Sequence, residues 1–174
     1  MSITGKIYVK YVMALNRIVR SQLKPNVKEY NSINDIDLTE IKRLKQEYGI
    51  GGMIIDVDGT IFQEYRYIPH SILRALKLLN KEFKIYLISN GKNEKIAKLA
   101  QILGIGYISR AFKPRRKPFI KASEEMGLNP ENIMVLGDGF LTDVLGGQRM
   151  GMHTATVKTL SSANKLKSSD EIQR

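Results

Sequence analysis

Apolar residues follow two different spacings along the chain, and the pattern changes near residue 50. Before this point, apolar positions recur every three or four residues, as on one face of a helix. After it, short continuous apolar runs of strand length alternate with segments of helical spacing. Such runs are typical of parallel strands that are buried on both faces. The pattern therefore predicts an α/β fold in which strands and helices alternate.

Five strands are expected, and helical segments separate them. The strands are predicted at 52–57, 83–88, 107–108, 133–136 and 154–157. Helices are predicted at 37–48, 69–81, 93–103, 119–126 and 142–150, with glycines at several of their ends. Because strand–helix–strand units form right-handed parallel crossovers, these elements predict a five-stranded parallel sheet covered by helices.

The first 28 residues differ from the rest of the chain because they contain no Asp or Glu. On a helix, their basic residues share one side and their apolar residues the other, which predicts a basic amphipathic helix over 1–28. Three interpretations stay open: the helix packs on the domain, residues 1–24 lie on an anionic membrane, or the segment is a transit sequence. The polar stretch from Asn26 to Asn34 is expected to be a linker.

Composition limits the remaining possibilities. The chain has 174 residues, 43% of them hydrophobic, which suits one packed domain at 29–160 with a polar tail at 161–174. The absence of cysteine excludes a disulfide scaffold and a Cys nucleophile. The net charge is +11, and residues 1–28 supply more than half of it, so the charge alone does not predict a nucleic-acid partner. No apolar run is long enough to span a bilayer.

Polar residues gather at the carboxyl ends of the expected strands, where open parallel sheets bind their ligands. In chain order they are Asp56, Asp58, Gly59 and Thr60, then Ser89, Asn90 and Gly91, then Lys113, then Asp138 and Asp143. Carboxylates without sulfur ligands suit Mg²⁺, and a hydroxyl and an ammonium beside the ion suit a phosphoryl group. The two histidines lie away from these strand ends, so a Ser–His–Asp triad is not expected.

The order Asp56-x-Asp58-Gly59-Thr60, Ser89, Lys113 and Gly137-Asp138-x4-Asp143 resembles the four motifs of the haloacid dehalogenase (HAD) superfamily of phosphatases. The resemblance covers about residues 50–158. The segments 141–151 and 30–38 resemble the YqeG-type, phosphatidylglycerophosphatase-like branch of subclass IIIA. The resemblance implies a three-layer, Rossmann-like fold and a Mg²⁺-dependent phosphatase.

It also implies a role for each motif residue. Asp56 would attack phosphorus to form an aspartyl-phosphate, and Asp58 would act as general acid and then as general base. Ser89 would hydrogen-bond a phosphoryl oxygen, and Lys113 would neutralise phosphoryl charge and hold Asp56. The metal-binding residues would be Asp56, Asp58 through its main-chain carbonyl, Asp138, and Asp143 directly or in support.

The spacing leaves no room for a cap domain, either between Thr60 and the helix at 69 or between Ser89 and Lys113. An uncapped site is open to a phosphate on a bulky molecule. Basic residues adjoin it, and Arg115 and Arg116 are expected to bind a second phosphate or an anionic head group. The expected substrate-binding residues are Thr60, Ser89, Asn90, Lys113, Arg115 and Arg116.

The favoured function is hydrolysis of a lipid phosphate such as phosphatidylglycerophosphate. The expected location is the cytoplasm or the membrane periphery, or the mitochondrial matrix of a eukaryote. One alternative is a phosphatase for a nucleic-acid end or a phosphoprotein, although no aromatic stacking platform is found. Another is a non-catalytic HAD-fold binding module, against which the intact Asp56 and Asp58 argue.

Overall fold

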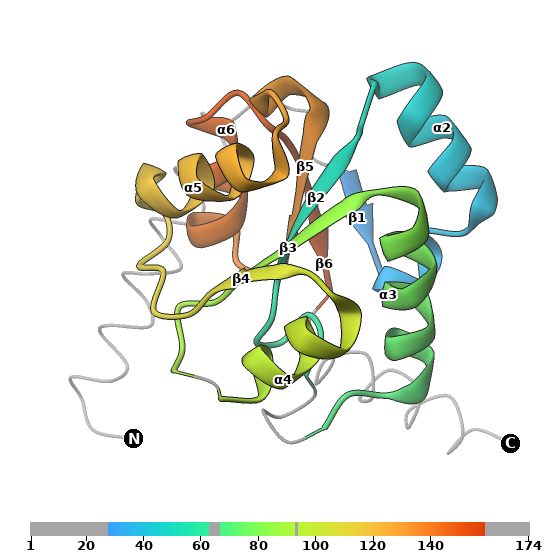
Figure 1. Cartoon of the computed structure of the whole chain (residues 1–174). Coiled ribbons are helices and arrows are strands. Elements are labelled where there is room, and N and C mark those ends of the chain that lie inside the picture. The colour runs from blue at the N-terminus through green and yellow to red at the C-terminus, as the bar shows by residue number, and fades with distance from the viewer. Residues whose placement is uncertain (1–27, 63–66, 93, 159–174) are drawn as a thin grey trace, which may run out of the picture.

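The computed structural model describes residues 28–62, 67–92 and 94–158, and six parallel strands within them form one sheet (Figure 1). The strands are β1 (Lys28–Tyr30), β2 (Gly52–Asp56), β3 (Lys84–Ile88), β4 (Gly106–Ile108), β5 (Ile133–Gly137) and β6 (His153–Val157). Their order across the sheet is β1-β6-β5-β2-β3-β4. The helices are α2 (Leu38–Tyr48), α3 (His70–Glu82), α4 (Glu94–Leu103), α5 (Arg116–Met126) and α6 (Leu145–Gln148).

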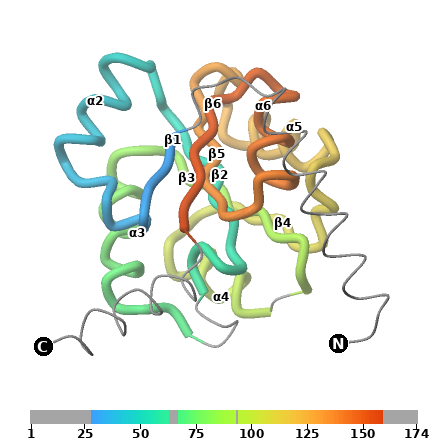
Figure 2. Tube along the Cα trace, turned by 180° about the vertical axis from the view of Figure 1, so that it is seen from behind, coloured from blue at the N-terminus to red at the C-terminus, as the bar shows by residue number. Residues whose placement is uncertain are grey.

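Helices cover both faces of the sheet, as Figures 1 and 2 show. Successive residues of β2 point to opposite faces. Met53 and Ile55 pack in a core with α2, α3 and α4, whereas Ile54 packs in a second core with Phe119 of α5. All five residues of β2 are buried, which explains its continuous apolar run. The expected three-layer α/β architecture is therefore confirmed.

The predicted number of strands was wrong, because the sheet has a sixth strand, β1. It lies inside the stretch from Asn26 to Asn34 that was expected to be a linker. Tyr30 pairs in parallel with Val157 of β6, and Ile33, three residues later, is fully buried in a short 3-10 helix. A strand of three residues is too short to show a periodicity, and its partner lies far away in the sequence.

The expected helix at 142–150 is divided in two. A five-residue π-helical segment, Phe140–Val144, precedes the short helix α6. Such segments are frequent at functional sites because they change the direction in which a side chain points. Here the segment carries Asp143, which is buried at the carboxyl edge of the sheet.

Two sequence predictions fall largely outside the described residues, namely the amphipathic helix at 1–28 and the polar tail at 161–174. No cap domain is evident in the part of the chain that the structure describes. Within the same residues, none of the helices has the length and apolar character needed to cross a membrane.

Candidate active site

Three carboxylates meet at the carboxyl edge of the sheet. Asp56 is the last residue of β2, Asp138 follows the adjacent strand β5, and Asp143 lies in the π-helical segment. One carboxylate oxygen from each lies within 4.8 Å of the others. Asp56 and Asp143 are buried and Asp138 is half-buried. The parallel pairing of β2 with β5 brings these distant residues together.

Lys113 enters this cluster from the loop between β4 and α5. Its Nζ donates to Asp56 Oδ1 at 2.5 Å, to Asp143 Oδ1 at 2.6 Å and to the carbonyl oxygen of Ile88 at 3.0 Å. Only 6% of the residue is exposed. Burial alone would lower the pKa of Lys113, but the charges of Asp143 and Asp56 outweigh burial and raise it. The lysine is therefore held in its charged form between two carboxylates.

One ammonium does not balance three carboxylates. Burial, followed by the charge of Asp143, raises the pKa of Asp56 to about 7, although Lys113 acts in the opposite direction. Asp138 raises it further. Such a cluster of oxygen ligands with excess negative charge fits a hard divalent cation such as Mg²⁺. The three aspartates therefore form a candidate metal site.

Asp58 lies two residues after Asp56 but makes a different contact. The Ser89 hydroxyl donates to Asp58 Oδ2 at 2.6 Å and accepts from the backbone N–H of Gly91 at 2.9 Å. A Cβ on Gly91 would lie 2.9 Å from Asp58 Oδ2, so the small residue makes room for this pair. The two carboxylates of the first motif are thus separated, one facing the lysine and the other facing the serine.

The residues that follow Asp58 form a tight turn. Gly59 has a φ of +86°, which confirms the expectation that this position needs an unusual backbone conformation. The hydroxyl of the fully buried Thr60 donates to Asp56 Oδ2 at 3.4 Å. Thr60 therefore contacts the carboxylate of Asp56 on the oxygen that Lys113 leaves free.

Asn90 has a role that sequence reasoning missed. The sequence predicts that it binds substrate, and the structure adds that its side chain holds the backbone of Lys113. Its Oδ1 accepts from the Lys113 N–H at 2.6 Å, and its Nδ2 donates to the Lys113 carbonyl at 3.2 Å. The amide joins the loops after β3 and β4, so it sets the position from which the lysine reaches the carboxylates.

Asp143 is also held by residues that the motif reading did not assign. The Gly139 N–H and the Thr142 hydroxyl both donate to Asp143 Oδ2 at 3.1 Å. A Cβ on Gly137 would lie only 2.4 Å from Asp143 Cγ. Gly137 and Gly139, which flank Asp138, are the sequence signal from which this close packing could have been inferred.

Arg115 and Arg116 lie where α5 begins, and both are exposed. The guanidinium of Arg115 stands 5.4 Å from the ring centroid of Phe112. Arg116 Nε lies 3.4 Å from the sulfur of Met150. The two arginines therefore adjoin the loop that carries Lys113.

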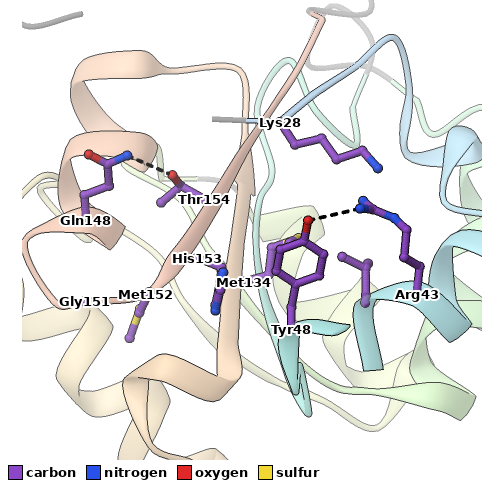
Figure 3. Close-up of a pocket in the computed structure, with 10 residues that line it drawn as sticks. Lys28, Arg43, Tyr48, Met134, Gln148, Gly151, Met152, His153 and Thr154 are labelled. Atoms are coloured by element: carbon purple, nitrogen blue, oxygen red, sulfur yellow. Dashed lines mark hydrogen bonds between the residues drawn. The ribbon is translucent and has the colours of Figure 1, made fainter. Parts of the chain in front are cut away.

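A pocket of about 560 Å³ lies at the other edge of the sheet, at the amino ends of β5 and β6 (Figure 3). Its lining includes Arg43, Tyr48 and His153, and the Tyr48 and His153 rings meet edge to face at 5.7 Å. None of the carboxylates of the metal cluster lines this pocket. His153 therefore lies at the amino end of β6, away from the three carboxylates.

Comparison with known proteins points to the same chemistry. The sequence profile of the family described as haloacid dehalogenase-like hydrolase matches residues 36–151. A Bacillus subtilis (strain 168) protein described as probable phosphatase YqeG is 35% identical over 123 residues, 68% of this chain and 70% of that protein. A glyceraldehyde 3-phosphate phosphatase of Methanopyrus kandleri is 27% identical over 79% of this chain and 64% of that protein.

Solved structures share the fold at low sequence identity. A HAD phosphatase from Thermococcus onnurineus superposes with a TM-score of 0.53 at 15% identity, covering 67% of this chain and 97% of that one. A HAD family enzyme from Bacteroides thetaiotaomicron, solved with magnesium and inorganic phosphate, gives 0.53 at 15% identity, covering 64% and 96%. The family match spans most of the chain and includes every motif residue described above. The chain therefore belongs to the haloacid dehalogenase-like hydrolases, and within them it is a phosphatase that acts on phosphomonoesters.

Proposed function

We propose that the chain hydrolyses its phosphomonoester in two steps, through a phosphate ester on Asp56. The observation that carries the proposal is the separation of the first two carboxylates. Lys113 holds Asp56 Oδ1 at 2.5 Å, while Ser89 holds Asp58 Oδ2 at 2.6 Å. One carboxylate is thereby oriented as a nucleophile, and the other is placed to carry a proton.

In the first step, a carboxylate oxygen of Asp56 attacks phosphorus and the bond from phosphorus to the leaving oxygen breaks. Asp58 gives its proton to that oxygen, so the product leaves as a neutral alcohol. In the second step, Asp58 takes a proton from water as the water attacks phosphorus. The bond between phosphorus and Asp56 then breaks and inorganic phosphate is released.

Lys113 neutralises the phosphoryl charge and keeps the nucleophile in place throughout. Ser89 supplies a hydroxyl to a phosphoryl oxygen. Mg²⁺, held by Asp56, Asp138 and the main-chain carbonyl of Asp58, would supply further positive charge to the phosphoryl oxygens. Asp143 supports that site through its contacts with Lys113 and Thr142. The magnesium found with phosphate in the Bacteroides enzyme agrees with this choice of metal.

As substrate we favour a lipid phosphate of the phosphatidylglycerophosphate type, presented at a membrane surface. Three observations support this choice: no cap is evident among the described residues, Arg115 and Arg116 are exposed near the site, and residues 1–24 are basic. Residues 1–24 would contact the anionic membrane. Sedimentation of the full chain with phosphatidylglycerol vesicles tests this contact, and failure to co-sediment at low salt would exclude it.

The nucleophile is tested by Asp56→Asn. The variant keeps the size of the side chain but removes the attacking oxygen anion, so hydrolysis of p-nitrophenyl phosphate in Mg²⁺ should fall by at least about a thousandfold. Far-UV circular dichroism checks that the variant is folded. Turnover at the wild-type rate would exclude Asp56 as the nucleophile.

A further inference from the structure

The pocket at the amino ends of β5 and β6 is a cavity that the proposed hydrolysis does not use (Figure 3). Met134 of β5 lines this pocket, four residues before Asp138 of the carboxylate cluster, or about 13 Å at the rise of a parallel strand. Pockets that bind small molecules have volumes of about 300–1,000 Å³. With about 560 Å³, this cavity is large enough for a ligand of its own.

The pocket is open because β1 covers only part of β6. Lys28, the first described residue of β1, pairs with Ala155, so no described strand pairs with the outer side of His153 and Thr154. On the inner side, both of these residues pair with β5. Tyr48, at the end of α2, approaches His153 in this opening, where their ring centroids lie 5.7 Å apart. The short outermost strand therefore leaves room for a ligand between β6 and α2.

One part of the lining is apolar and aromatic. Leu44, Met134 and Met152 line the pocket and are buried. Tyr48 is 41% exposed, although its ring is held edge to face by the His153 ring. Aromatic rings in such an arrangement offer apolar surface to a further flat group. This part of the pocket therefore suits a planar, apolar ligand group.

The other part of the lining is positively charged. Lys28 and Arg43 point their charged ends towards each other in Figure 3, and no Asp or Glu is among the described residues that line the pocket. Both cations bind the carboxylate of Glu40, so two positive charges share one negative charge. Glu47 lies 3.7 Å from Arg43, but it is 61% exposed and screened by water. The lining therefore keeps an excess of positive charge.

The Arg43 guanidinium is fixed in one orientation. Its Nε and Nη2 donate to Glu40 at 2.9 and 2.8 Å, and its Nη1 donates to the Tyr48 hydroxyl at 3.1 Å. These bonds use three of the five N–H groups of a guanidinium. Because the other donors are already oriented, an anion that accepts from them orders little further structure on binding.

We propose that this pocket is a second ligand site, and that it binds a small organic anion that carries a flat apolar ring. The anionic group accepts from Arg43 and Lys28, and the ring lies against Tyr48, His153 and the two methionines. A neutral ligand would leave the cations without an acceptor, and an inorganic anion would leave the apolar lining in water. The proposal does not depend on the hydrolytic mechanism, because the carboxylate cluster takes no part in it.

The test titrates the full chain with naphthalene-2-carboxylate and follows its two histidines by proton NMR at one fixed pH. His153 lines the pocket, whereas His70 is exposed on α3 and serves as an internal reference. The His153 resonance should shift to saturation with a dissociation constant of about 0.1–1 mM, as is usual for a ligand of this size. The His70 resonance should not move. A His153 resonance that stays unchanged at millimolar ligand would overturn the proposal.

Two related compounds separate the charge from the ring. Naphthalene-2-carboxamide has the same shape without the charge, and it should bind about tenfold more weakly because a charge-assisted hydrogen bond is replaced by a neutral one. Acetate keeps the charge without the ring and should cause no saturable shift. Equal binding of the carboxylate and the carboxamide would contradict an anion site.

A fourth compound distinguishes two sources of such an anion. Adenosine 3′,5′-cyclic monophosphate carries a flat ring and an anion, and it is not a phosphomonoester that the chain could hydrolyse. Tighter binding of this compound than of naphthalene-2-carboxylate would identify a nucleotide as the ligand class. The reverse order would identify a small aromatic acid, and either order supports the shared chemistry.

Variants assign the two parts of the lining. Arg43→Gln should weaken binding of naphthalene-2-carboxylate about tenfold and leave binding of the carboxamide unchanged. Tyr48→Leu should weaken binding of both compounds by about three- to tenfold. The controls are Lys42→Gln, an exposed residue of α2 outside the lining, and Tyr107→Leu, which is 42% exposed on β4. Neither control should change binding.

Arg43 also belongs to the network around Glu40, so its structural role must be separated from ligand binding. Binding of the carboxamide to Arg43→Gln at the wild-type affinity shows that the pocket is intact. An equal loss of both compounds, together with a lower unfolding temperature, would assign Arg43 a purely structural role and overturn the anion site. Displacement of the ligand by Mg²⁺ with inorganic phosphate would place it at the carboxylate cluster instead, and this result would also overturn the proposal.

Discussion

Lys113 is the residue on which the charge balance of the active site depends. It is the shared partner of Asp56 and Asp143, and both carboxylates are buried. Removing one member of a buried ionic group leaves the others without compensation, and this costs more than the group contributes when intact. The lysine to which we assign a catalytic role is therefore also expected to matter for folding.

We expect Lys113→Met to destabilise the metal-free protein by about 3–5 kcal/mol at pH 8. The loss of unfolding free energy relative to wild type should become smaller as the pH falls. Burial and Asp143 already raise the pKa of Asp56 to about 7, and loss of the Lys113 ammonium raises this pKa further. A carboxylate with a raised folded pKa destabilises the fold as the pH rises and is relieved by protonation. Urea denaturation in EDTA at pH 5.5 and pH 8 measures the effect.

The exposed Lys117→Met on α5 is the matched control and should change the free energy of unfolding by less than about 0.5 kcal/mol. Addition of Mg²⁺ should restore part of the stability of Lys113→Met, because the ion neutralises the same carboxylates. A deficit of equal size at both pH values would contradict the assigned charge balance.

At the scale of elements, the π-helical segment after β5 decides where Asp143 lies. β5 ends at Gly137, and the π-helical segment that follows brings the Asp143 side chain back into contact with Gly137. This close approach is possible only because Gly137 and Gly139 carry no side chain. The π-helical segment thus lies at the candidate metal site, where such irregular turns are frequent.

Gly137→Ala tests this arrangement. The new methyl group would lie 2.4 Å from Asp143 Cγ, so the carboxylate must move and its contact with Lys113 must lengthen. We expect kcat/KM and the apparent affinity for Mg²⁺ to fall by about ten- to a hundredfold, as for other residues that position metal ligands. Activity assays across a range of Mg²⁺ concentrations measure both quantities.

Gly51→Ala is the control, since its nearest neighbour would be a methyl group of Leu128 at 3.4 Å. This change should be close to neutral for activity. Wild-type kinetics in Gly137→Ala would show that Asp143 can move without consequence.

At the scale of the whole molecule, the carboxyl ends of the strands and the outermost strand β1 have different roles. The candidate catalytic residues lie at the carboxyl ends of the strands, whereas a polar network on β1 and α2 holds the outermost strand, β1, against the rest of the domain. Glu40 of α2 accepts hydrogen bonds from Arg43, Lys28 and Tyr30. The hydrogen bonds from Arg43 are the main cause that lowers the pKa of Glu40 from 4.5 to about 2, and those from Lys28 and Tyr30 contribute. Burial acts in the opposite direction.

The stability of the whole chain should therefore depend on Glu40 in a pH-dependent way. Because the folded pKa is depressed, the stabilisation is present above pH 4.5 and is lost as the pH falls towards 2. Glu40→Gln should lower the free energy of unfolding at pH 7, and the difference from wild type should narrow by pH 3. Urea denaturation at both pH values checks the prediction.

Glu47→Gln is the matched control, because Glu47 lies 3.7 Å from Arg43 and its side chain is 61% exposed. It should have little effect at either pH, as is usual for surface ion pairs. If Glu40→Gln were as harmless as Glu47→Gln, the network would not be what fastens β1 to the domain.

The sequence by itself determined the fold class, the helices α2 to α5, the central strands and the order of the motifs. This was possible because buried parallel strands have continuous apolar runs, and because parallel pairing places all their carboxyl ends at one edge. The four motifs could therefore be assigned to one site before any distance was known. Gly59 could be assigned a turn for the same local reason.

Only the tertiary structure decided which charged groups form ion pairs with one another and which strand lies at the outer side of the sheet. Lys113 bridges Asp56 and Asp143 while Asn90 holds its backbone, and these four residues come from four separate loops or strand ends. β1 was hidden in a polar stretch because its stability comes from pairing with β6 at the other end of the domain. Spacing along a chain reports local periodicity, whereas hydrogen bonds between distant segments depend on how the loops fold over the sheet.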